Sequence, residues 1–329
     1  MAVDGGVARR ALGDSGLTAS VAGIGGNVFG PPRLDQAQTN AIIAAALDLG
    51  VDFIDTANVY GQGQSEEMIG RAIGTRRDAF TIATKFNLRG LGDGDSVASH
   101  IRAQAEQSLR KLGSDHIDLY QLHQPRDDVP MAEILAVLSD LVAEGKVRAV
   151  GACNFAGWRL AEARQIAVSG GYVAFVTVQN YYHVLARQAE AEVVPYAQRS
   201  GLGVLPYHPL AGGFLTGKYR RAEPAPAGTR GASGSRMIDW IRTEENYRAL
   251  DRLGVLAGAC GRTPGELALA WLASRTAVSS VIAGVSSVDQ LRSNVAACAY
   301  VPDEQTLGEI DRLVAPGSIQ DPERPPYLA

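Results

Sequence analysis

Apolar residues along the chain fall into short runs that alternate with longer stretches in which they recur every three or four positions. The short runs predict buried strands, and the longer stretches predict amphipathic helices. The predicted strands are Asp52–Asp55, Phe80–Lys85, Ile117–His123, Val147–Cys153, Phe175–Asn180, Gly203–Pro206 and Ser279–Ile282. The predicted helices are Gln36–Leu49, a segment beginning at Ser65, Ser96–Leu112, Met131–Glu144, Trp158–Val168, Ala189–Arg199, Thr243–Ala259, Pro264–Ser274 and Val288–Ala297.

Turn and cap residues mark several boundaries between these segments. Arg9–Leu12 and Leu17–Val21 flank Gly13-Asp14-Ser15-Gly16, which predicts a β-hairpin able to plug the bottom of a barrel. Ser65 is the predicted N-cap of its helix. Residues 222–236 are rich in Pro, Gly, Ala and Ser, and we predict a long loop there because the alternation resumes afterwards.

Strands that alternate with helices form a parallel sheet, either an open doubly wound sheet or a closed barrel. A dinucleotide-binding open sheet carries G-x-G-x-x-G between its first strand and first helix. The nearest sequence, Gly23-Ile24-Gly25-Gly26-Asn27-Val28-Phe29-Gly30, does not have that spacing. The strand–helix units number close to the eight of a TIM barrel. We therefore predict an α/β fold, a (β/α)8 TIM barrel with an N-terminal β-hairpin and additional C-terminal helices and loops, as a single domain over residues 1–329.

Composition and charge exclude several classes of protein. The formal net charge of −4 gives no electrostatic footprint for nucleic acid or an anionic membrane. Charges or glycines interrupt every apolar window before it reaches the length of a membrane span, and the first residues show no signal peptide. Cys153, Cys260 and Cys298 are too widely spaced for a zinc site or a disulfide framework. We therefore expect no metal and a cytoplasmic location, while the oligomeric state stays open.

Polar residues stand at the C-terminal ends of the predicted strands, where TIM barrels keep their chemistry. They are Asp55 with Tyr60 on the loop that follows, Lys85, His123, Cys153-Asn154, Gln179-Asn180 and Tyr207-His208. Taken singly, the aspartate is often a helix cap, the tyrosine a rim aromatic and the histidine a structural group. A lysine that finishes a buried strand, however, requires a counter-charge or a function. Together these residues predict a proton-transfer site.

Four of these residues suit the protonation of an oxygen that gains negative charge. A phenol titrates at about 10, and a neighbouring Lys85 ammonium is expected to lower the pKa of Tyr60 toward neutrality. Asp55 would anchor Lys85 and keep it charged. His123 would hydrogen-bond a substrate carbonyl oxygen and orient it toward Tyr60. Carbonyl reduction by hydride transfer requires this kind of proton delivery.

The sequence around these four residues resembles the aldo-keto reductase superfamily, in particular its potassium-channel β-subunit-like branch as found in bacteria. The matching segments are Gly50–Gly61 (GVDFIDTANVYG), Thr84-Lys85, Asp118–His123 (DLYQLH), Gly151–Phe155, Val178–Asn180, Pro206–Leu210, Gly213–Tyr219 and Gly284–Asn294. The resemblance implies a (β/α)8 barrel with a catalytic tetrad of Asp55, Tyr60, Lys85 and His123. It also implies an oxidoreductase that reduces an aldehyde, a ketone or a keto-sugar, with NADP(H) as the usual cofactor.

The resemblance further implies which residues bind the cofactor. Asn154 and Gln179 would hold the carboxamide, and Tyr207 would stack on the nicotinamide ring. The pyrophosphate would lie on the backbone of His208, Pro209, Leu210 and Gly212, and a helix N-terminus is a natural phosphate site. The other implied cofactor residues are Gly26, Asn27, Asp55 and Cys153 near the ring, Lys218 and Arg230 as cations for phosphate, and Gly284, Ser286, Gln290 and Asn294 near the adenosine end.

Several positions depart from the family pattern. Cys153 and His208 stand where the family usually has serine, and a thiol is a weaker hydrogen-bond donor. Gly284 and Gln290 align with the lysine and arginine that some branches use for the 2′-phosphate. The resemblance still favours NADP over NAD, but these two positions lack the cations for the 2′-phosphate, so NAD(H) stays possible.

Two other functions stay open from the sequence. One is a cofactor-binding, redox-sensing regulatory subunit with little turnover, as channel β-subunits are. The presence of His123, which completes the tetrad, argues against it. The other is a phosphate-binding barrel isomerase or lyase, which would bind neither NADPH nor NADH.

Overall fold

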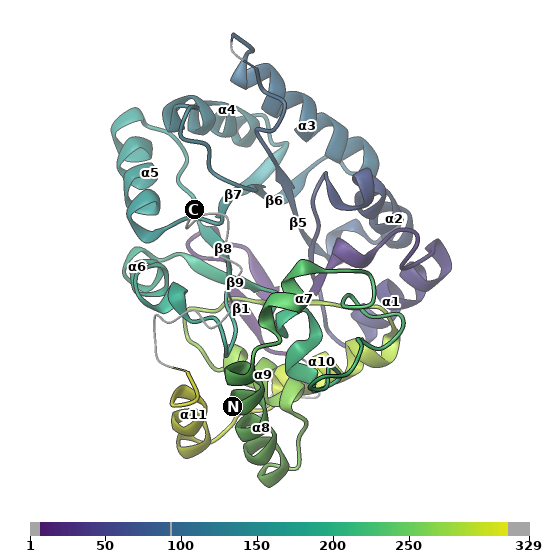
Figure 1. Cartoon of the computed structure of the whole chain (residues 1–329). Helices are drawn as coiled ribbons and strands as arrows, with labels where there is room; N and C mark the ends of the chain where they lie inside the picture. The colour runs from purple at the N-terminus through teal and green to yellow at the C-terminus, as the bar shows by residue number, and fades with distance from the viewer. Residues whose placement is uncertain (1–6, 93, 315–329) are drawn as a thin grey trace.

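The structure, a computed structural model, describes residues 7–92 and 94–314. Within these residues eight parallel strands close into a barrel in the order β10, β3, β4, β5, β6, β7, β8, β9 (Figure 1). The strands are β3 (Ala22–Gly25), β4 (Phe53–Asp55), β5 (Thr81–Phe86), β6 (Ile117–Leu122), β7 (Val147–Cys153), β8 (Thr177–Tyr181), β9 (Gly203–Tyr207) and β10 (Val281–Gly284). The predicted (β/α)8 barrel is therefore confirmed.

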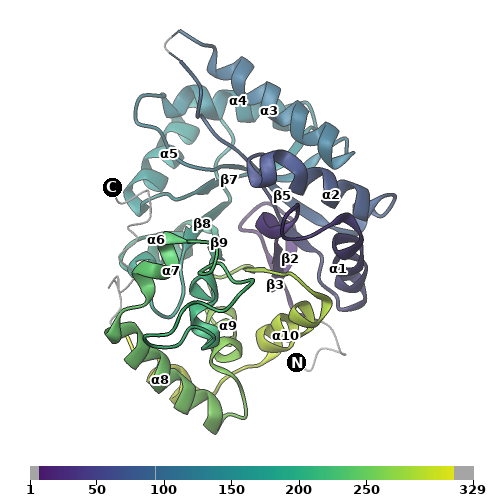
Figure 2. The same ribbon diagram turned by 45° about the vertical axis from the view of Figure 1, so that its right-hand side comes forward.

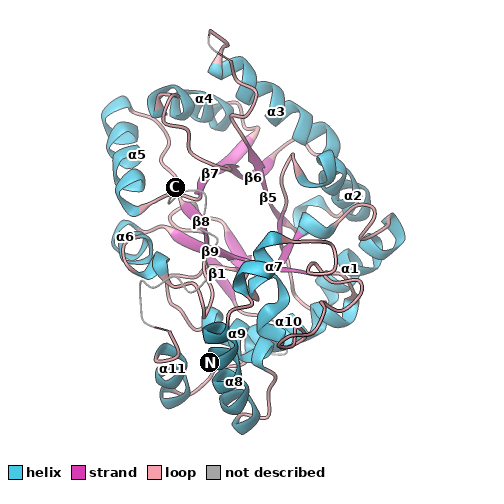
Figure 3. Ribbon diagram, viewed as in Figure 1, coloured by secondary structure: helices cyan, strands magenta, loops and turns pink. Residues whose placement is uncertain are grey.

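Helices form an outer ring around the strands (Figure 3). They are α1 (Gln36–Asp48), α2 (Gln64–Ile73), α3 (Val97–Leu112), α4 (Met131–Ala143), α5 (Gly157–Gly170), α6 (Val193–Ser200), α7 (Arg236–Ile241), α8 (Glu244–Ala259), α9 (Pro264–Ala273), α10 (Val288–Ala299) and α11 (Glu304–Asp311). Helices α7, α8 and α9 all belong to the connection between β9 and β10, together with the predicted loop at residues 222–236 (Figure 2). No helix in the described part of the chain is long and apolar enough to cross a membrane.

Some local predictions differ from the structure. The prediction does not include β3, because two of its four residues are glycines, which weaken a strand signal. It also does not include α7 and α11, which are short. Ser65 as an N-cap is wrong. Ser65 lies inside α2. Its hydroxyl donates to the Gly26 carbonyl (2.7 Å) and lies 2.8 Å from the Thr56 hydroxyl, so it ties α2 to the residues that directly follow β3 and β4.

The predicted hairpin, β1 (Arg9–Ala11) and β2 (Thr18–Ser20), closes one end of the barrel. Leu12 and Ala19 are fully buried and pack into one cluster with inward-facing barrel residues. These barrel residues are Phe53, Ala83, Leu119, Ala149, Leu205 and Ile282. Because apolar side chains fill this end, the polar side chains of the barrel gather at the other end.

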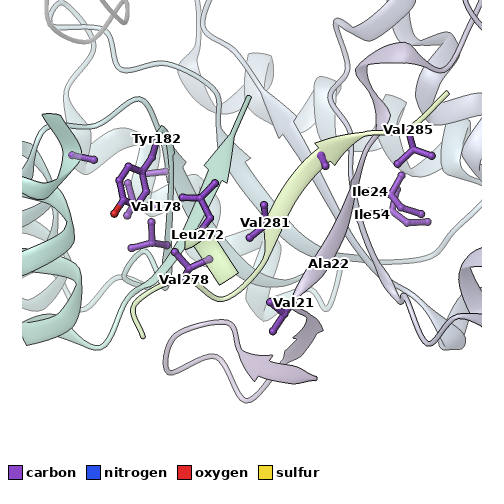
Figure 4. Close-up of a cluster of buried hydrophobic side chains, with 14 of the residues drawn as sticks. Val21, Ala22, Ile24, Ile54, Val178, Tyr182, Leu272, Val278, Val281 and Val285 are labelled. Carbon is purple, nitrogen blue, oxygen red and sulfur yellow. The ribbon is translucent and has the colours of Figure 1, made fainter. Parts of the chain in front are cut away.

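A second apolar core separates the barrel from the helices. Figure 4 shows Ile54, Val178 and Val281 among its members. Successive residues of a strand face opposite sides of the sheet. Ile54 therefore packs in this outer core, whereas Phe53 packs in the cluster inside the barrel. The same alternation directs the carboxyl of Asp55 into the barrel.

His183 is fully buried in the turn that follows β8. Its Nδ1 accepts a hydrogen bond from the Leu185 amide (3.2 Å), so the neutral ring carries its proton on Nε2. Burial, with His208 nearby, lowers the pKa of His183 to about 3. The folded protein therefore keeps this ring neutral at pH values that protonate it in the unfolded chain.

Truncation of Leu12 tests the role of the hairpin plug. Leu12→Ala should lower the free energy of unfolding by about 2–4 kcal/mol, because it leaves a cavity in a fully buried cluster. Val255, on α8, is 75% exposed, so Val255→Ala should change stability by less than about 0.5 kcal/mol. Urea unfolding of both variants measures the difference, and equal effects would contradict a packed plug.

Replacement of His183 tests the pH dependence of stability. Between about pH 6.5 and 5 the unfolded chain protonates His183 while the folded protein does not, so the unfolded state binds more protons and stability falls as the pH falls. His183→Asn removes this group and keeps an acceptor for the Leu185 amide. We expect a stability–pH slope that is shallower by one proton, with parallel curves above about pH 7.5. Urea unfolding at half-unit pH steps measures it, and an unchanged slope would show that His183 is not held neutral.

Candidate active site

A cavity of about 260 Å³ opens at the C-terminal ends of the barrel strands. Predicted site residues from seven of the eight barrel strands, or from the loops that follow them, line it. They are Gly26, Asn27, Asp55, Tyr60, His123, Asn154, Gln179, Tyr207, His208, Arg230 and Gly284. The structure therefore brings most of the predicted site together in one place. Among the described residues no group of His, Cys, Asp and Glu is arranged to hold a metal ion.

Lys85 lies at the centre of the site and is fully buried. Its ammonium donates to Asp55 Oδ2 (2.6 Å) and to the Thr56 carbonyl (2.8 Å). It also lies 3.4 Å from the Tyr60 hydroxyl. The attraction of Asp55 and Tyr60 outweighs the effect of burial and raises the pKa of Lys85 above its ordinary value. The expectation that Asp55 keeps Lys85 charged agrees with this geometry.

Tyr60 begins the short helical turn Tyr60–Gly63 after β4, in which Gly61 and Gln62 have positive φ angles of 55° and 58°. This tight turn brings the phenol back over the strand ends. The Tyr60 ring meets the His123 ring edge to face, with centroids 5.9 Å apart. The phenol and the imidazole therefore face the same cavity, next to the Lys85 ammonium.

The predicted decrease in the pKa of Tyr60 is wrong. Burial raises the pKa of Tyr60 above its ordinary value, and the opposing attraction of Lys85 does not overcome it. Burial, together with Lys85 and Arg89, lowers the pKa of His123 to about 3. At neutral pH the site thus holds a protonated phenol, a neutral imidazole and one buried ion pair.

Asp55 also accepts two hydrogen bonds from glutamines through its other oxygen. Gln179 Nε2 donates to Asp55 Oδ1 at 2.7 Å, and Gln121 Nε2 donates to the same oxygen at 3.2 Å. The resemblance implied that Gln179 contacts the carboxamide, and here its amide nitrogen is directed at Asp55. The prediction did not single out Gln121. Its signal was a polar side chain two residues before His123, on the same face of the predicted strand.

Asn154, which follows β7, and Tyr207, at the end of β9, line the cavity together. The Tyr207 hydroxyl donates to Asn154 Oδ1 (2.8 Å), and Asn154 Nδ2 donates to the His123 carbonyl (2.9 Å). Asn154 has a positive φ of 60°, which asparagine tolerates better than most residues. These bonds fix the Tyr207 ring and the Asn154 amide before any ligand binds.

The loop after β9 presents backbone to the cavity mouth. His208, Ala211, Gly212 and Gly213 have positive φ angles of 53°, 50°, 66° and 95°. The φ of 66° at Gly212 favours glycine, and a β-carbon there would displace the flexible end of Met237 on α7, 2.2 Å away. Within this loop the Ala211 and Gly213 amides donate to the His208 and Leu210 carbonyls (both 2.8 Å), which closes two tight turns beside the cavity.

Arg230 crosses the cavity mouth. It lies 3.4 Å from His208 Nδ1 and donates to Asn27 Oδ1 at 3.3 Å. Burial and the Arg230 charge lower the pKa of His208 to about 3, so this imidazole is neutral and accepts from the guanidinium. Arg230 thus joins the loops that follow β3 and β9.

The other predicted cofactor residues do not line this cavity; they are Cys153, Pro209, Leu210, Gly212, Lys218, Ser286, Gln290 and Asn294. Lys218 is exposed, close to Gly213. At the start of α10 the Ser286 hydroxyl donates to Gln290 Oε1 (2.9 Å), and Asn294 follows one turn later. Cys153 is buried beneath the cavity, where its thiol contacts Gln121.

Three comparisons relate this chain to known proteins. It is 34% identical over 331 residues to the uncharacterized oxidoreductase YrpG of Bacillus subtilis (strain 168), covering 95% of this chain and 97% of the relative. It is 31% identical to a putative voltage-gated potassium channel subunit beta of Schizosaccharomyces pombe, covering 93% and 92%. It is 32% identical to aflatoxin B1 aldehyde reductase member 2 of Rattus norvegicus, covering 84% and 80%.

A sequence profile of the aldo/keto reductase family matches residues 22–315. This range starts at the first residue of β3 and extends past α11, so it contains the whole barrel and every residue of the site described above. The chain therefore belongs to the aldo/keto reductase family and is an oxidoreductase.

Proposed function

We propose that this protein reduces the carbonyl of an aldehyde, a ketone or a keto-sugar to an alcohol, with NADP(H) as cofactor and Tyr60 as proton donor. The observation that carries the proposal is the fully buried Lys85 ammonium, held between Asp55 (2.6 Å) and the Tyr60 hydroxyl (3.4 Å) at the cavity floor. A protonated phenol beside a fixed positive charge suits an oxygen that becomes an alkoxide.

Tyr60 and Lys85 have different roles in the proton transfer. Because the pKa of Tyr60 is raised, the phenol carries its proton at neutral pH and is ready to donate it. When the proton leaves, the Lys85 ammonium stabilises the phenolate that remains. In the direction of alcohol oxidation, the same phenolate accepts the proton.

His123 supplies a neutral hydrogen-bonding group next to Tyr60. With its pKa near 3, the imidazole stays uncharged throughout the physiological range. It therefore orients the substrate oxygen by a hydrogen bond without adding a second positive charge beside Lys85. A substrate carbonyl placed between His123 and Tyr60 would receive both contacts.

The residues of the cavity fit a nicotinamide cofactor. When bound, NADP(H) supplies the hydride. Tyr207, held by Asn154, offers a ring face to the nicotinamide, and the amides of Asn154 and Gln179 lie within the same cavity wall. The backbone from His208 to Gly213, with its run of positive φ angles, offers a cradle for the pyrophosphate.

Charged and polar residues at the cavity mouth and beyond it would contact the phosphates and the adenosine of the same cofactor. Arg230 and Lys218 supply positive charge for phosphate groups. The N-terminus of α10, capped by Ser287, lies beside Ser286 and Gln290, and a helix N-terminus favours an anionic group. These features favour a dinucleotide with an additional phosphate, so we propose NADP(H) over NAD(H).

One alternative function has specific support, the similarity to a putative voltage-gated potassium channel subunit beta. Under this alternative the protein senses the redox state of bound cofactor and turns over little. The complete set of Asp55, Tyr60, Lys85 and His123 favours an enzyme, because a sensor without turnover does not need a proton donor.

A steady-state assay with NADPH and 4-nitrobenzaldehyde tests the function and the role of Tyr60. Wild-type protein should oxidise NADPH in a saturable reaction, and a protein that binds NADPH without turnover would instead support the sensor. Tyr60→Phe should lower kcat by about 10²-fold or more, because the variant lacks the proton donor. The Kd for NADPH, followed by fluorescence, should stay within twofold.

Two further variants complete this test. Lys85→Met should lower kcat to a similar extent, because the phenolate loses its stabilising charge. Tyr172→Phe, at a tyrosine outside the site, is the matched control and should retain wild-type activity. A Tyr60→Phe variant as active as this control would disprove the proposed proton donor.

Cofactor preference is tested by equilibrium binding of NADPH and NADH to the wild-type protein. The Kd for NADPH should be at least about tenfold lower, which corresponds to 1.4 kcal/mol. The additional 2′-phosphate is expected to gain charge-assisted hydrogen bonds that NADH lacks. Tighter binding of NADH would reverse the proposed preference and leave the proton-transfer assignment intact.

A further inference from the structure

We propose that Gln121 is a positioning residue for the Asp55–Lys85 pair, and that the Cys153 thiol anchors the other end of the Gln121 amide. The inference rests on the proposed function, because it concerns the same proton-delivery site. Gln121 lies on β6, two residues before His123, and it is fully buried beneath the cavity. It does not line the cavity, so it would act on the reaction through Asp55.

The hydrogen bonds around Gln121 leave one consistent orientation of its amide. A carboxylate accepts hydrogen bonds and does not donate them, so the group that faces Asp55 Oδ1 at 3.2 Å must be the NH₂ group. The carbonyl oxygen Oε1 then faces Cys153, 3.7 Å from its sulfur. Burial raises the pKa of Cys153 above its ordinary value, so the thiol is protonated and donates to Oε1. If the amide turned over, the NH₂ group would face the thiol and two oxygens would oppose each other at Asp55.

The neighbouring strand makes room for this side chain. Gly151 of β7 pairs with Gln121 in the barrel. A β-carbon at Gly151 would lie 3.1 Å from Gln121 Cγ and 2.4 Å from the Thr177 hydroxyl. A larger residue at position 151 would therefore displace the stem of Gln121 or the adjacent strand.

Gln121 completes the set of donors around the Asp55 carboxylate. Lys85 donates to Oδ2, while Gln121 and Gln179 donate to Oδ1. The titratable groups near Asp55 are Lys85 from β5, Tyr60 from the loop after β4, Cys153 from β7 and His123 beyond β6. With two donors on one oxygen, Asp55 cannot rotate away from Lys85 without breaking bonds. The ammonium is thereby kept 3.4 Å from the Tyr60 hydroxyl.

Substitution of Gln121 tests this role through the rate and pH profile of the chemical step. The rate is that of NADPH oxidation in a single turnover with 4-nitrobenzaldehyde. Gln121→Leu, of similar volume, should lower this rate at pH 7 by about tenfold or more, with the Kd for NADPH within twofold. Gln121→Glu places a second carboxyl against Asp55, so the pair should retain a proton at neutral pH. Only a protonated carboxyl at position 121 can donate to Asp55 as the glutamine does, so the rate of this variant should fall as the pH rises from 6 to 9, a limb absent in the wild type.

Substitution of Cys153 tests the anchoring contact. Cys153→Ala removes the donor to Gln121 Oε1 and leaves that end of the buried amide unanchored, so the rate should fall about threefold to tenfold. Cys153→Ser supplies a hydroxyl to the same oxygen and should be at least about threefold faster than Cys153→Ala. A matched control is Gln188→Leu, at a buried glutamine on the short helix Gln188–Glu190 whose side-chain atoms have no hydrogen-bond partner in the described structure.

Some outcomes would overturn the inference. Gln121→Leu and Cys153→Ala rates within twofold of Gln188→Leu, with wild-type pH profiles, would show that Gln121 only fills space. A measurement that does not depend on turnover separates this result from failure of the proposed function. In Gln121→Glu the folded state should bind one proton more than the unfolded state near pH 7, so its stability should fall as the pH rises. If the variant shows this slope while the wild-type protein lacks reductase activity, the hydrogen-bond network around Asp55 is supported and the proposed function is disproved.

Discussion

The structure depends above all on one buried ion pair, between the Lys85 ammonium and the Asp55 carboxylate, 2.6 Å apart inside the barrel. A buried ammonium without a partner costs several kcal/mol, so neither residue is tolerable at this depth without the other. The pair requires β4 and β5 to be neighbours, which their direct parallel pairing provides. The two glutamines on the second oxygen of Asp55 satisfy the remaining acceptor capacity, so the pair is hydrogen-bonded as well as neutralised.

The layered interior of the barrel explains why this pair is effective. Apolar side chains from the hairpin and the strands fill the end of the barrel that the hairpin closes. The polar layer lies next to them, toward the C-terminal ends of the strands. An electrostatic interaction is stronger where water is excluded. The same exclusion raises the pKa of Tyr60 and lowers that of His123, so both groups are neutral beside the ammonium. The site therefore keeps a transferable proton next to a fixed positive charge.

Much of the fold and of the tetrad could be predicted from the sequence. The alternation of strand and helix patterns predicts the barrel, because periodicity reports directly which residues are buried. Asp55, Lys85 and His123 stand at strand ends and Tyr60 on the loop after Asp55, and parallel strands in a barrel bring those ends together. The hairpin followed from its turn residues. Short or glycine-rich elements such as β3 and α7 escaped prediction, since tertiary packing and not local preference holds them.

The sequence by itself determined which strand ends carry chemistry, and it determined the family. The tertiary structure decided what each group faces. Only the folded barrel places Gln121 and Gln179 on one oxygen of Asp55, 66 and 124 residues away in sequence. It also reversed the expected direction of the Tyr60 pKa. A sequence pattern shows that Lys85 is near, but the balance between its charge and the burial of the phenol depends on the distances and on excluded water, which exist only after folding.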